Sequence, residues 1–386
     1  MKVLAIHNIL WSHYKAKIFT ELHHRLRKEG NDLFVLQLAF SELSRLGLKT
    51  DLSIHTYPYE VLFPDKAIEH IGHREKTQKL IAALRAYNPD VVYLNGYYDP
   101  SYWVVLAYCK LRKIKIVLDF ESSEISRRRV WWKEGMKKFF LNQCDALVCL
   151  GQKAAEYALK LGVPRDRIMS TKNVGVDNEA LLGIFTRERQ LRAQRKEEMG
   201  LPPYNFLYAG RFVARKNLDL FIRAFHEAQQ LSAHGHEWGL ILSGEGNQKP
   251  RLQELIRSLG MESVQWMEPC EWYEVPIRYT LADVAVLPST FEPFGFVTNE
   301  AMVYAMPVLV SERCGSAHDL VIDGLNGFRF DPYSQPDFTS KLLWFMDHPE
   351  KFGQMGSNGK AIIDQWSPDI ITDELILSFH KVSTHV

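Results

Sequence analysis

Short apolar runs of strand length alternate along the whole chain with segments of helical periodicity. In the first half of the chain the apolar runs are residues 3–6, 33–38, 91–94, 114–118 and 146–150. Each run precedes a polar or glycine-bearing turn, as a buried parallel strand does. The first intervening segment, residues 12–28, predicts a helix with Phe19, Leu22 and Leu26 on one face. This alternation predicts βαβ units and a doubly wound sheet.

The same alternation begins again after a charged break over residues 186–199, which Gly200 ends. The apolar runs of the second half are residues 205–209, 239–243, 284–287, 307–310 and 328–330. We therefore predict an α/β protein with two Rossmann-like doubly wound domains, over residues 1–180 and 203–366. Residues 181–202 are predicted to form the charged linker between them.

Composition agrees with two globular domains. The chain has 386 residues, 46% of them hydrophobic and 24% charged, which is enough to bury large cores and excludes a disordered chain. The net charge of +1 conceals an asymmetry: residues 1–200 carry 33 basic against 23 acidic residues, and residues 201–386 carry 14 against 23. The two halves, at +10 and −9, are expected to meet different partners. Nucleic acid is not expected among them, because no basic stripe with a recognisable module is present.

The chain shows no sign of a disulfide framework, a metal site or a membrane span. Its five cysteines are scattered, the N-terminal residues lack a secretory apolar segment, and the longest clean apolar stretch is residues 301–310. We expect a cytoplasmic protein without a metal, and peripheral attachment to the inner face of a membrane stays open.

Residues 287–301 carry the strongest chemical signal. A buried strand ends in a loop containing Glu292, and a helix is predicted to begin near Phe296 with Glu300 in its first turn. The free N–H groups of residues 295–297 could then hold a phosphate. Two carboxylates beside an anion make sense if they accept hydrogen bonds from sugar or ribose hydroxyls. Alternatively, Glu300 only complements the helix dipole and Glu292 only occupies a turn.

Residues 208–218 place two cations after another buried strand. Gly210 and Arg211 follow the strand, and Lys216 lies where the next helix is predicted to begin. Ligands of open α/β sheets bind at the carboxyl ends of strands. A diphosphate suits this pair, because arginine offers a planar fork and lysine a point charge. The alternative is a solvated turn that happens to contain a lysine.

Together with the Gly-x-Gly at Gly244 and the glycine-bearing turns of residues 315–327, these segments resemble the family 4 glycosyltransferases of the two-Rossmann GT-B architecture. Glu292 and Glu300 match the Glu-x7-Glu signature of that family, and Arg211 with Lys216 matches its Gly-Arg…Lys motif. The resemblance is close over residues 203–332 and looser in the first domain. It also implies that a final helix, over residues 367–386, crosses back to the first domain.

The resemblance implies a retaining enzyme that moves a hexose-type sugar from a UDP- or GDP-linked donor, with no obligatory metal or other cofactor. Arg211 and Lys216 would hold the diphosphate, Glu300 the ribose and Glu292 the hydroxyls of the sugar. The donor-binding residues implied in this way are Gly210, Arg211, Lys216, Gly244, Trp266, Met267, Glu268, Glu292, Phe294, Gly295, Phe296, Val297 and Glu300.

The first domain departs from the family pattern in two places. Residues 7–14 lack the Gly-Gly pair that often follows the first strand, and the histidine that often follows the strand at 114–118 is absent. Asp119 and Glu121 stand there instead. Either could be a catalytic residue facing the donor sugar, or these polar residues only cap the next helix.

The acceptor is expected on the basic first domain. Its candidate residues are His13, Lys17, Arg127, Arg128 and Trp131. Drawn as a helix, residues 127–140 align Trp132, Met136 and Phe139 on one face, with lysines beside it. This face either packs on the sheet, as in most amphipathic helices, or docks on an anionic membrane that presents a lipid-linked acceptor.

The function predicted from the sequence is therefore a hexosyltransferase of polysaccharide biosynthesis, acting on a glycan, lipid-linked or small-molecule acceptor. Two alternatives stay open. One is a nucleotide-sugar epimerase or hydrolase on the same fold, and the other is a catalytically silent scaffold that binds a nucleotide sugar.

Overall fold

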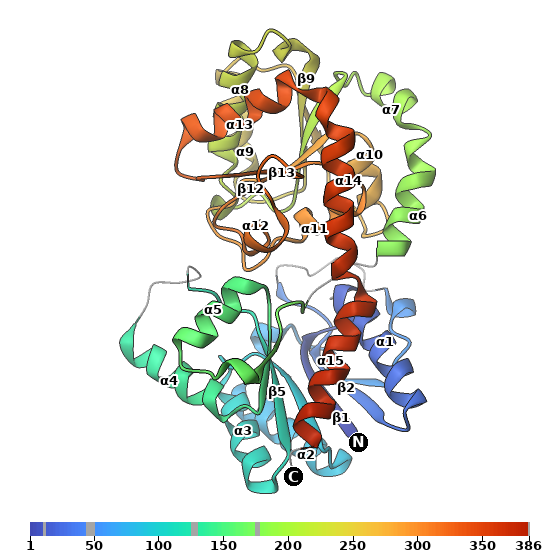
Figure 1. The fold of residues 1–386 in the computed structure, drawn as a ribbon, viewed down its shortest axis with the longest axis vertical. Coiled ribbons are helices and arrows are strands. Elements are labelled where there is room, and N and C mark those ends of the chain that lie inside the picture. The colour runs from blue at the N-terminus through green and yellow to red at the C-terminus, as the bar shows by residue number, and fades with distance from the viewer. Residues whose placement is uncertain (11–12, 44–50, 125–129, 174–177, 385–386) are drawn as a thin grey trace. The chain divides into compact units, whose positions relative to one another are not determined.

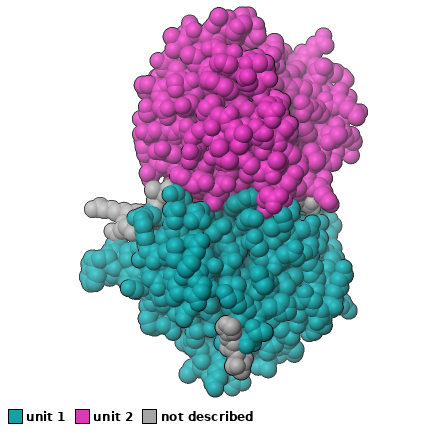
Figure 2. Space-filling view, in the orientation of Figure 1, with its two compact units in different colours: residues 1–175, 366–386 teal, residues 176–365 magenta. Residues whose placement is uncertain are grey.

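The computed structural model describes residues 1–10, 13–43, 51–124, 130–173 and 178–384, and it folds into two α/β units (Figures 1 and 2). Unit 1 consists of residues 1–175 together with 366–386, and unit 2 of residues 176–365. Each unit is built on its own sheet, as the two runs of βαβ alternation predict.

The sheet of unit 1 has seven strands in the order β3-β2-β1-β4-β5-β6-β7, and every neighbouring pair is parallel. Its strands are β1 (Lys2–Ile9), β2 (Asp32–Ala39), β3 (Tyr59–Phe63), β4 (Val91–Asn95), β5 (Lys115–Phe120), β6 (Ala146–Cys149) and β7 (Ile168–Ser170). The helices are α1 (His13–Lys28), α2 (His73–Tyr87), α3 (Pro100–Arg112), α4 (Trp131–Gln143), α5 (Gln152–Lys160) and α15 (Pro368–Ser383). The direction in which successive strands are added reverses between β1 and β4, which is the topological switch point of the sheet.

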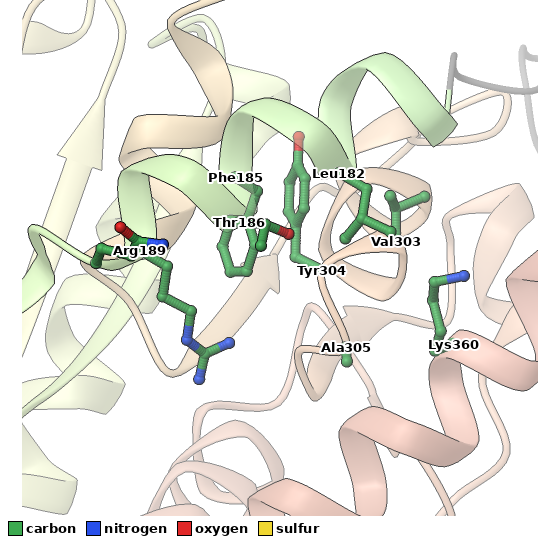
Figure 3. Close-up of a pocket in the computed structure, with 9 residues that line it drawn as sticks. Leu182, Phe185, Thr186, Arg189, Val303, Tyr304, Ala305 and Lys360 are labelled. Atoms are coloured by element: carbon green, nitrogen blue, oxygen red, sulfur yellow. The ribbon is translucent and has the colours of Figure 1, made fainter.

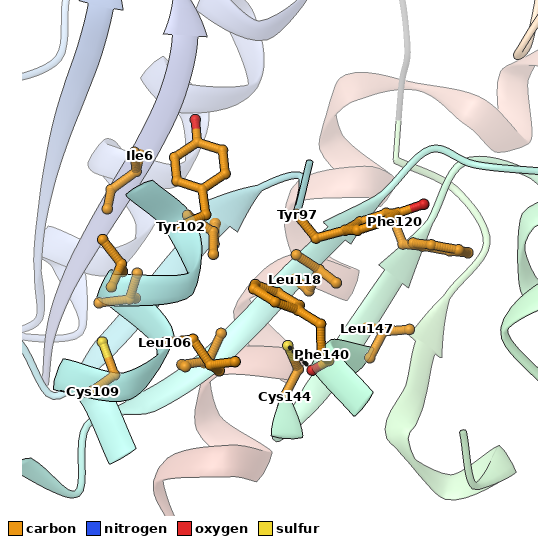
Figure 4. Close-up of a cluster of buried hydrophobic side chains, with 14 of the residues drawn as sticks. Ile6, Tyr97, Tyr102, Leu106, Cys109, Leu118, Phe120, Phe140, Cys144 and Leu147 are labelled. Atoms are coloured by element: carbon orange, nitrogen blue, oxygen red, sulfur yellow. Dashed lines mark hydrogen bonds between the residues drawn. The ribbon is translucent and has the colours of Figure 1, made fainter. Parts of the chain in front are cut away.

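Two apolar clusters cover the two faces of this sheet. Figure 4 shows one of them, which includes Leu118 and Phe120 of β5, Phe140 of α4 and Cys109 of α3. The other packs α1 and α15 on the opposite face. Because the central strands bury both faces, their sequences are continuously apolar rather than alternating.

Helix α15 begins after Ser367, whose Oγ accepts a hydrogen bond from the N–H of Ile370. The helix packs in unit 1 against α1 and against strands β5, β6 and β7. Arg25 of α1 forms ion pairs with Asp369 and Asp373 of α15, the second at 2.5 Å. The end of the chain thus completes the core of the unit in which the chain begins.

The sheet of unit 2 has six strands in the order β10-β9-β8-β11-β12-β13, again with every neighbouring pair parallel. The strands are β8 (Tyr204–Ala209), β9 (Trp238–Ser243), β10 (Val264–Met267), β11 (Val284–Leu287), β12 (Val308–Ser311) and β13 (Gly327–Phe330). The helices are α6 (Asn178–Arg189), α7 (Arg192–Glu198), α8 (Leu218–Leu231), α9 (Lys249–Ser258), α10 (Val275–Thr280), α11 (Phe296–Val303), α12 (Gly315–Leu320), α13 (Gln335–Asp347) and α14 (Phe352–Ile363). Its switch point lies between β8 and β11.

The segment predicted as a charged linker, residues 181–202, forms most of α6 and α7 and belongs to unit 2. Leu181 and Phe185 of α6 are buried, and the Phe185 ring stacks on Tyr304 with the ring centroids 4.5 Å apart. Charge dominates the sequence of this segment, yet a few apolar side chains at helical spacing are enough to attach it to the domain.

Candidate functional site

The switch point of unit 2 brings together two residues that the sequence analysis placed in separate motifs. Lys216 follows β8 and Glu292 follows β11, and the Lys216 Nζ lies 2.6 Å from the Glu292 Oε1. Ser289 donates a hydrogen bond of 3.2 Å to the same oxygen. The two charged side chains retain only 11% and 10% of their exposed surface. Such a pair is strengthened by the low local dielectric and is held in one geometry.

The loops around this pair approach each other closely. A Cβ on Gly244, which has φ +142°, would lie 2.0 Å from the carbonyl oxygen of Gly210, so only glycine fits between the turns after β8 and β9. Arg211 follows Gly210, is exposed, and accepts a hydrogen bond of 2.8 Å from the Tyr208 hydroxyl at its carbonyl. The first glycine of the Gly-x-Gly motif is therefore required by the close packing of the two turns.

Glu300, the second carboxylate of the Glu-x7-Glu signature, is oriented by a hydrogen bond from a tyrosine. Helix α11 begins at Phe296, after Gly295 with φ +108°, and a Cβ on Gly295 would meet a Leu287 methyl at 2.4 Å. Glu300 is the fifth residue of the helix, so the expectation that it lies in the first turn is wrong by one residue. It is buried and accepts a 2.7 Å hydrogen bond from the hydroxyl of Tyr279 in α10. This partner also argues against a role limited to the helix dipole.

The sequence contained no local signal for Tyr279, because α10 is a short helix without a motif. The N–H groups of residues 295–297 lie at the amino end of α11, where backbone N–H groups have no partner within the helix. Phe294, beside them, is fully buried. It therefore supports the loop rather than offering a surface to a ligand.

The residues expected near a base lie at the end of β10. The carbonyl of Met267 accepts a 2.9 Å hydrogen bond from the N–H of Gly244, and the Trp266 ring packs edge-on against Phe212. Glu268 is exposed and forms a 2.8 Å ion pair with Lys249. The strand end is thus joined to the Gly-x-Gly turn, on the same edge of the sheet as Lys216.

In unit 1, Asp119 lies at the centre of a buried polar network. Its Oδ2 accepts hydrogen bonds from the Lys15 Nζ at 3.0 Å, the Tyr93 hydroxyl at 3.1 Å and the Asn95 amide at 3.0 Å, and its Oδ1 accepts one from Asn173. Burial and the Asp119 charge raise the pKa of Tyr93, so the hydroxyl stays a donor. Both oxygens of Asp119 are occupied, and this carboxylate orders the strand ends.

Glu121 differs from Asp119 in being exposed. Crowding by surrounding protein atoms and the charge of Asp119 raise the pKa of its carboxyl to about 7, although part of the side chain remains open to solvent. Of the two carboxylates predicted to replace the family histidine, Glu121 is the one available to a ligand.

The apolar face of α4 does not pack on the sheet. Trp132, Met136 and Phe139 are 48%, 47% and 57% exposed, so the expectation that they form part of the core is wrong. Phe140, beside them, is buried and supplies the core contact. Trp131 is 85% exposed at the start of the helix. The helical periodicity correctly predicted that α4 has an apolar face, but it does not determine whether that face packs against the protein or stays exposed.

The remaining acceptor candidates are less informative. Lys17 of α1 forms an ion pair of 3.3 Å with Glu21, one turn further along the helix. Arg127, Arg128 and the side chain of His13 lie outside the described residues.

A separate pocket in unit 2, of about 500 Å³, lies between α6 and the end of α11 (Figure 3). Phe185, Val303 and Tyr304 line it, with Arg189 and Lys360 at its sides. It adjoins the carboxyl end of α11, whereas Gly295 precedes the amino end. Within the described ranges, no cluster of three or more metal-ligating side chains is found. No helix in the same ranges is long and apolar enough to cross a membrane.

Two family models match adjoining parts of the chain. Residues 16–177 match the model described as Glycosyltransferase Family 4, and residues 190–362 match the one described as Glycosyl transferases group 1. Together they account for most of the chain.

Individual relatives match shorter regions. D-inositol 3-phosphate glycosyltransferase 2 of Catenulispora acidiphila is 31% identical over 216 residues, which are 54% of this chain and 49% of that protein. Alpha-D-kanosaminyltransferase of Streptomyces kanamyceticus is 29% identical over 173 residues, or 44% of each chain. The chain thus spans about half the length of the relatives it matches.

Solved structures match over the full length. Anabaena Alr3699/HepE in complex with UDP has a TM-score of 0.75 at 18% identity, covering 99% of this chain and 100% of that chain. WaaG, a glycosyltransferase involved in lipopolysaccharide biosynthesis, has a TM-score of 0.65 at 15% identity, with 100% of both chains covered. These likenesses establish the two-domain GT-B fold.

The Asp119 network predicts a large stability effect. Asp119→Asn should lower the free energy of unfolding by about 3–5 kcal/mol, because the buried Lys15 charge loses its counter-ion. Glu124→Gln, which removes the charge of an exposed ion pair with Lys160, should cost less than about 1 kcal/mol. Urea unfolding followed by circular dichroism measures both. Equal losses in the two variants would contradict the structural role of Asp119.

Proposed function

We propose that this protein is a retaining enzyme that transfers a hexose from a nucleoside-diphosphate sugar to a hydroxyl group of its acceptor. The chain belongs to the family 4 glycosyltransferases, and the proposal starts from that membership. The observation that carries the proposal is the Lys216–Glu292 pair at the switch point of unit 2. A cation for a phosphate and a carboxylate for a hydroxyl lie within 2.6 Å of each other there. In a nucleotide sugar, the terminal phosphate and the sugar hydroxyls are neighbours in the same way.

Each group of the donor has a counterpart in the site. Lys216 and Arg211, with the N–H groups at the start of α11, bind the diphosphate, and Glu292 accepts hydrogen bonds from the sugar hydroxyls. Glu300, oriented by Tyr279, accepts hydrogen bonds from the ribose. The base lies near the end of β10. The UDP bound to Anabaena HepE supports a uridine nucleotide as the first donor to test.

During transfer, the bond between the anomeric carbon and the phosphate oxygen breaks, and its electron pair goes to the diphosphate. Lys216, Arg211 and the helix N–H groups stabilise this developing charge. The acceptor oxygen forms the new bond on the face that the phosphate leaves, so the configuration is retained. The proton of the acceptor hydroxyl goes to the departing phosphate oxygen. No step requires a metal, and the site supplies its positive charge from side chains and backbone.

The exposed face of α4 suits contact with an anionic membrane. Trp131, Trp132 and Phe139 present aromatic surface, and the Lys133 ammonium lies 5.3 Å from the Trp132 ring. Aromatic side chains next to lysines favour the boundary between lipid headgroups and acyl chains. The net charge of +10 on residues 1–200 adds long-range attraction. We propose that this face holds the enzyme at a membrane surface where lipid-linked acceptors lie.

The donor assignment is tested with a panel of nucleotide sugars and measurement of nucleoside diphosphate release. Lys216→Ala should lower turnover on the order of 100-fold, because charge on the leaving diphosphate is no longer balanced. Arg257→Ala, an exposed cation of α9, is the control and should retain turnover. Release that needs no acceptor would indicate a hydrolase instead. Binding without release would indicate a silent scaffold.

Glu300→Ala should weaken nucleoside diphosphate binding by roughly 1.5–3 kcal/mol, about 10- to 150-fold, because charge-assisted hydrogen bonds to the ribose are lost. Glu292→Ala should remove turnover, while nucleoside diphosphate binding is retained or modestly tightened, because the carboxylate that competes for the Lys216 ammonium group is gone. Isothermal titration with UDP and GDP measures the difference. If both variants bind the nucleotide as the parent does, the ribose assignment is wrong.

Membrane contact predicts flotation with vesicles that grows with their content of anionic lipid and weakens as salt is raised. Changing Trp131, Trp132 and Phe139 together to serine should abolish flotation. Leu231→Ser removes an equally exposed apolar side chain from α8 of unit 2 and should have no effect. Absence of flotation of the parent at low salt would rule the membrane contact out.

A further inference from the structure

Unit 1 contains a cavity of about 430 Å³ at its own switch point. Asn8 of β1, Asn95 at the end of β4 and Glu121 just after β5 line it. Ligands of open parallel sheets bind at this place, outside the carboxyl ends of the strands where the strand order reverses. Every residue that lines the cavity belongs to unit 1, so its chemistry is defined by that unit alone.

A pair of fixed tyrosine rings forms one wall. The rings of Tyr97 and Tyr98 stack with centroids 4.2 Å apart, and both hydroxyls lie within hydrogen-bond distance of the Ser122 Oγ, at 3.1 and 2.7 Å. Tyr97 is buried, whereas Tyr98 is 57% exposed. An exposed aromatic face held in place suits the apolar C–H face of a sugar ring, and its negative quadrupole also attracts an ammonium group.

Among the polar side chains around these rings, carboxylates outnumber lysines. The Asn8 Oδ1 accepts a 2.8 Å hydrogen bond from the Tyr102 hydroxyl, which orients the Asn8 amide. The lining contains four carboxylates, and Lys76 is its single lysine. The charged residues of the lining are Glu69, Lys76, Asp99, Asp119 and Glu121. His73 lines the cavity as well, and its Nδ1 lies 3.2 Å from the Asp99 Oδ1.

Two of these carboxylates are neutralised within the protein. Asp99 pairs with the buried Lys76, and Asp119 pairs with Lys15. The Lys76 ammonium group is therefore already paired with Asp99 and is too buried to bind a ligand. Within the described ranges, Glu69 accepts a hydrogen bond from the backbone N–H of Leu43 and forms no ion pair, so it contributes a negative charge to the cavity. Glu121 adds a second negative charge when ionised, and the cavity as a whole repels anions.

We propose that this cavity is the acceptor subsite and that it selects an uncharged or amine-bearing sugar or polyol over a phosphorylated or carboxylated one. The proposal rests on the proposed function, since an acceptor is needed only if sugar is transferred. The ring of the acceptor lies on Tyr98, and its hydroxyls or ammonium group meet Glu121, Glu69 and the amides of Asn8 and Asn95. Among the described residues that line the cavity, a phosphate group on the acceptor would lie beside like charges and would meet no lysine or arginine that is not already paired.

Binding to the full chain without a donor tests the selectivity directly. Saturation-transfer difference NMR, with methyl glucoside, galactose, inositol, glucosamine and glucose 6-phosphate as probes, gives relative affinities. At about pH 8 Glu121 is ionised, and glucose 6-phosphate should bind on the order of tenfold more weakly than the best neutral or amino probe at low salt. Equal or tighter binding of the phosphorylated sugar overturns the proposal, and so does binding by none of the other probes.

Two sets of variants connect the result to this cavity. Glu69→Gln combined with Glu121→Gln should narrow the discrimination against glucose 6-phosphate by several-fold, whereas Glu60→Gln on the exposed side of β3 should leave it unchanged. Tyr98→Ala should weaken binding of the neutral sugar about tenfold, and Tyr98→Phe, which keeps the ring, should restore it. Unchanged selectivity in the double variant would place the sugar elsewhere.

Titration of the same samples with UDP and GDP distinguishes a failure of the acceptor inference from a failure of the proposed function. If nucleotide binds and depends on Glu300 while the phosphorylated sugar is preferred, the acceptor inference alone fails. If no nucleotide binds but the sugar preference holds, the proposed function fails and the cavity is a sugar site of another kind.

Discussion

The common direction of the strands is the constraint on which both sites depend. Every neighbouring strand pair in the two sheets is parallel, so all carboxyl ends of a sheet share one edge. Where strand order reverses, adjacent connections run to opposite faces and leave a crevice. Lys216 and Glu292 meet there in unit 2, and Asn8 and Asn95 line the corresponding cavity in unit 1. Residues far apart in sequence become neighbours by topology alone.

The buried carboxylates Asp119 of unit 1 and Glu292 of unit 2 differ in how many hydrogen bonds they accept. Asp119 is saturated by donors on both oxygens and serves the fold. Glu292 has its Oε1 engaged by Lys216 and Ser289, and no contact of its other oxygen was identified within the described ranges. A carboxylate has about four acceptor positions. Glu292 is therefore held in place while it keeps acceptor capacity, which is consistent with the proposed binding of sugar hydroxyls.

Much of this could be predicted from the sequence, because the central strands are buried on both faces and read as continuous apolar runs. The motif residues follow those runs directly, so their placement at one edge was implied. The edge strands β3, β7 and β10 were not predicted, since each of them is only partly buried. The roles of Tyr279 and Asn173 could not be predicted either. Each residue acts through a hydrogen bond to a carboxylate distant in sequence, Glu300 and Asp119 respectively. The exposed face of α4 shows the same limit: periodicity defines a face but not its neighbour.

The ion pair between Lys216 and Glu292 also bears on how an enzyme of this kind would complete its cycle. A lysine already matched by a carboxylate is ordered before anything binds, so little side-chain entropy is lost when a diphosphate arrives. The same carboxylate competes for the ammonium group, which limits how tightly the spent nucleotide is retained. Once the sugar has been transferred, Glu292 would no longer accept hydrogen bonds from sugar hydroxyls and would pair again with the Lys216 ammonium group. In an enzyme of the proposed kind, Glu292 would thus serve as the counter-ion of Lys216 between turnovers, favouring departure of the product.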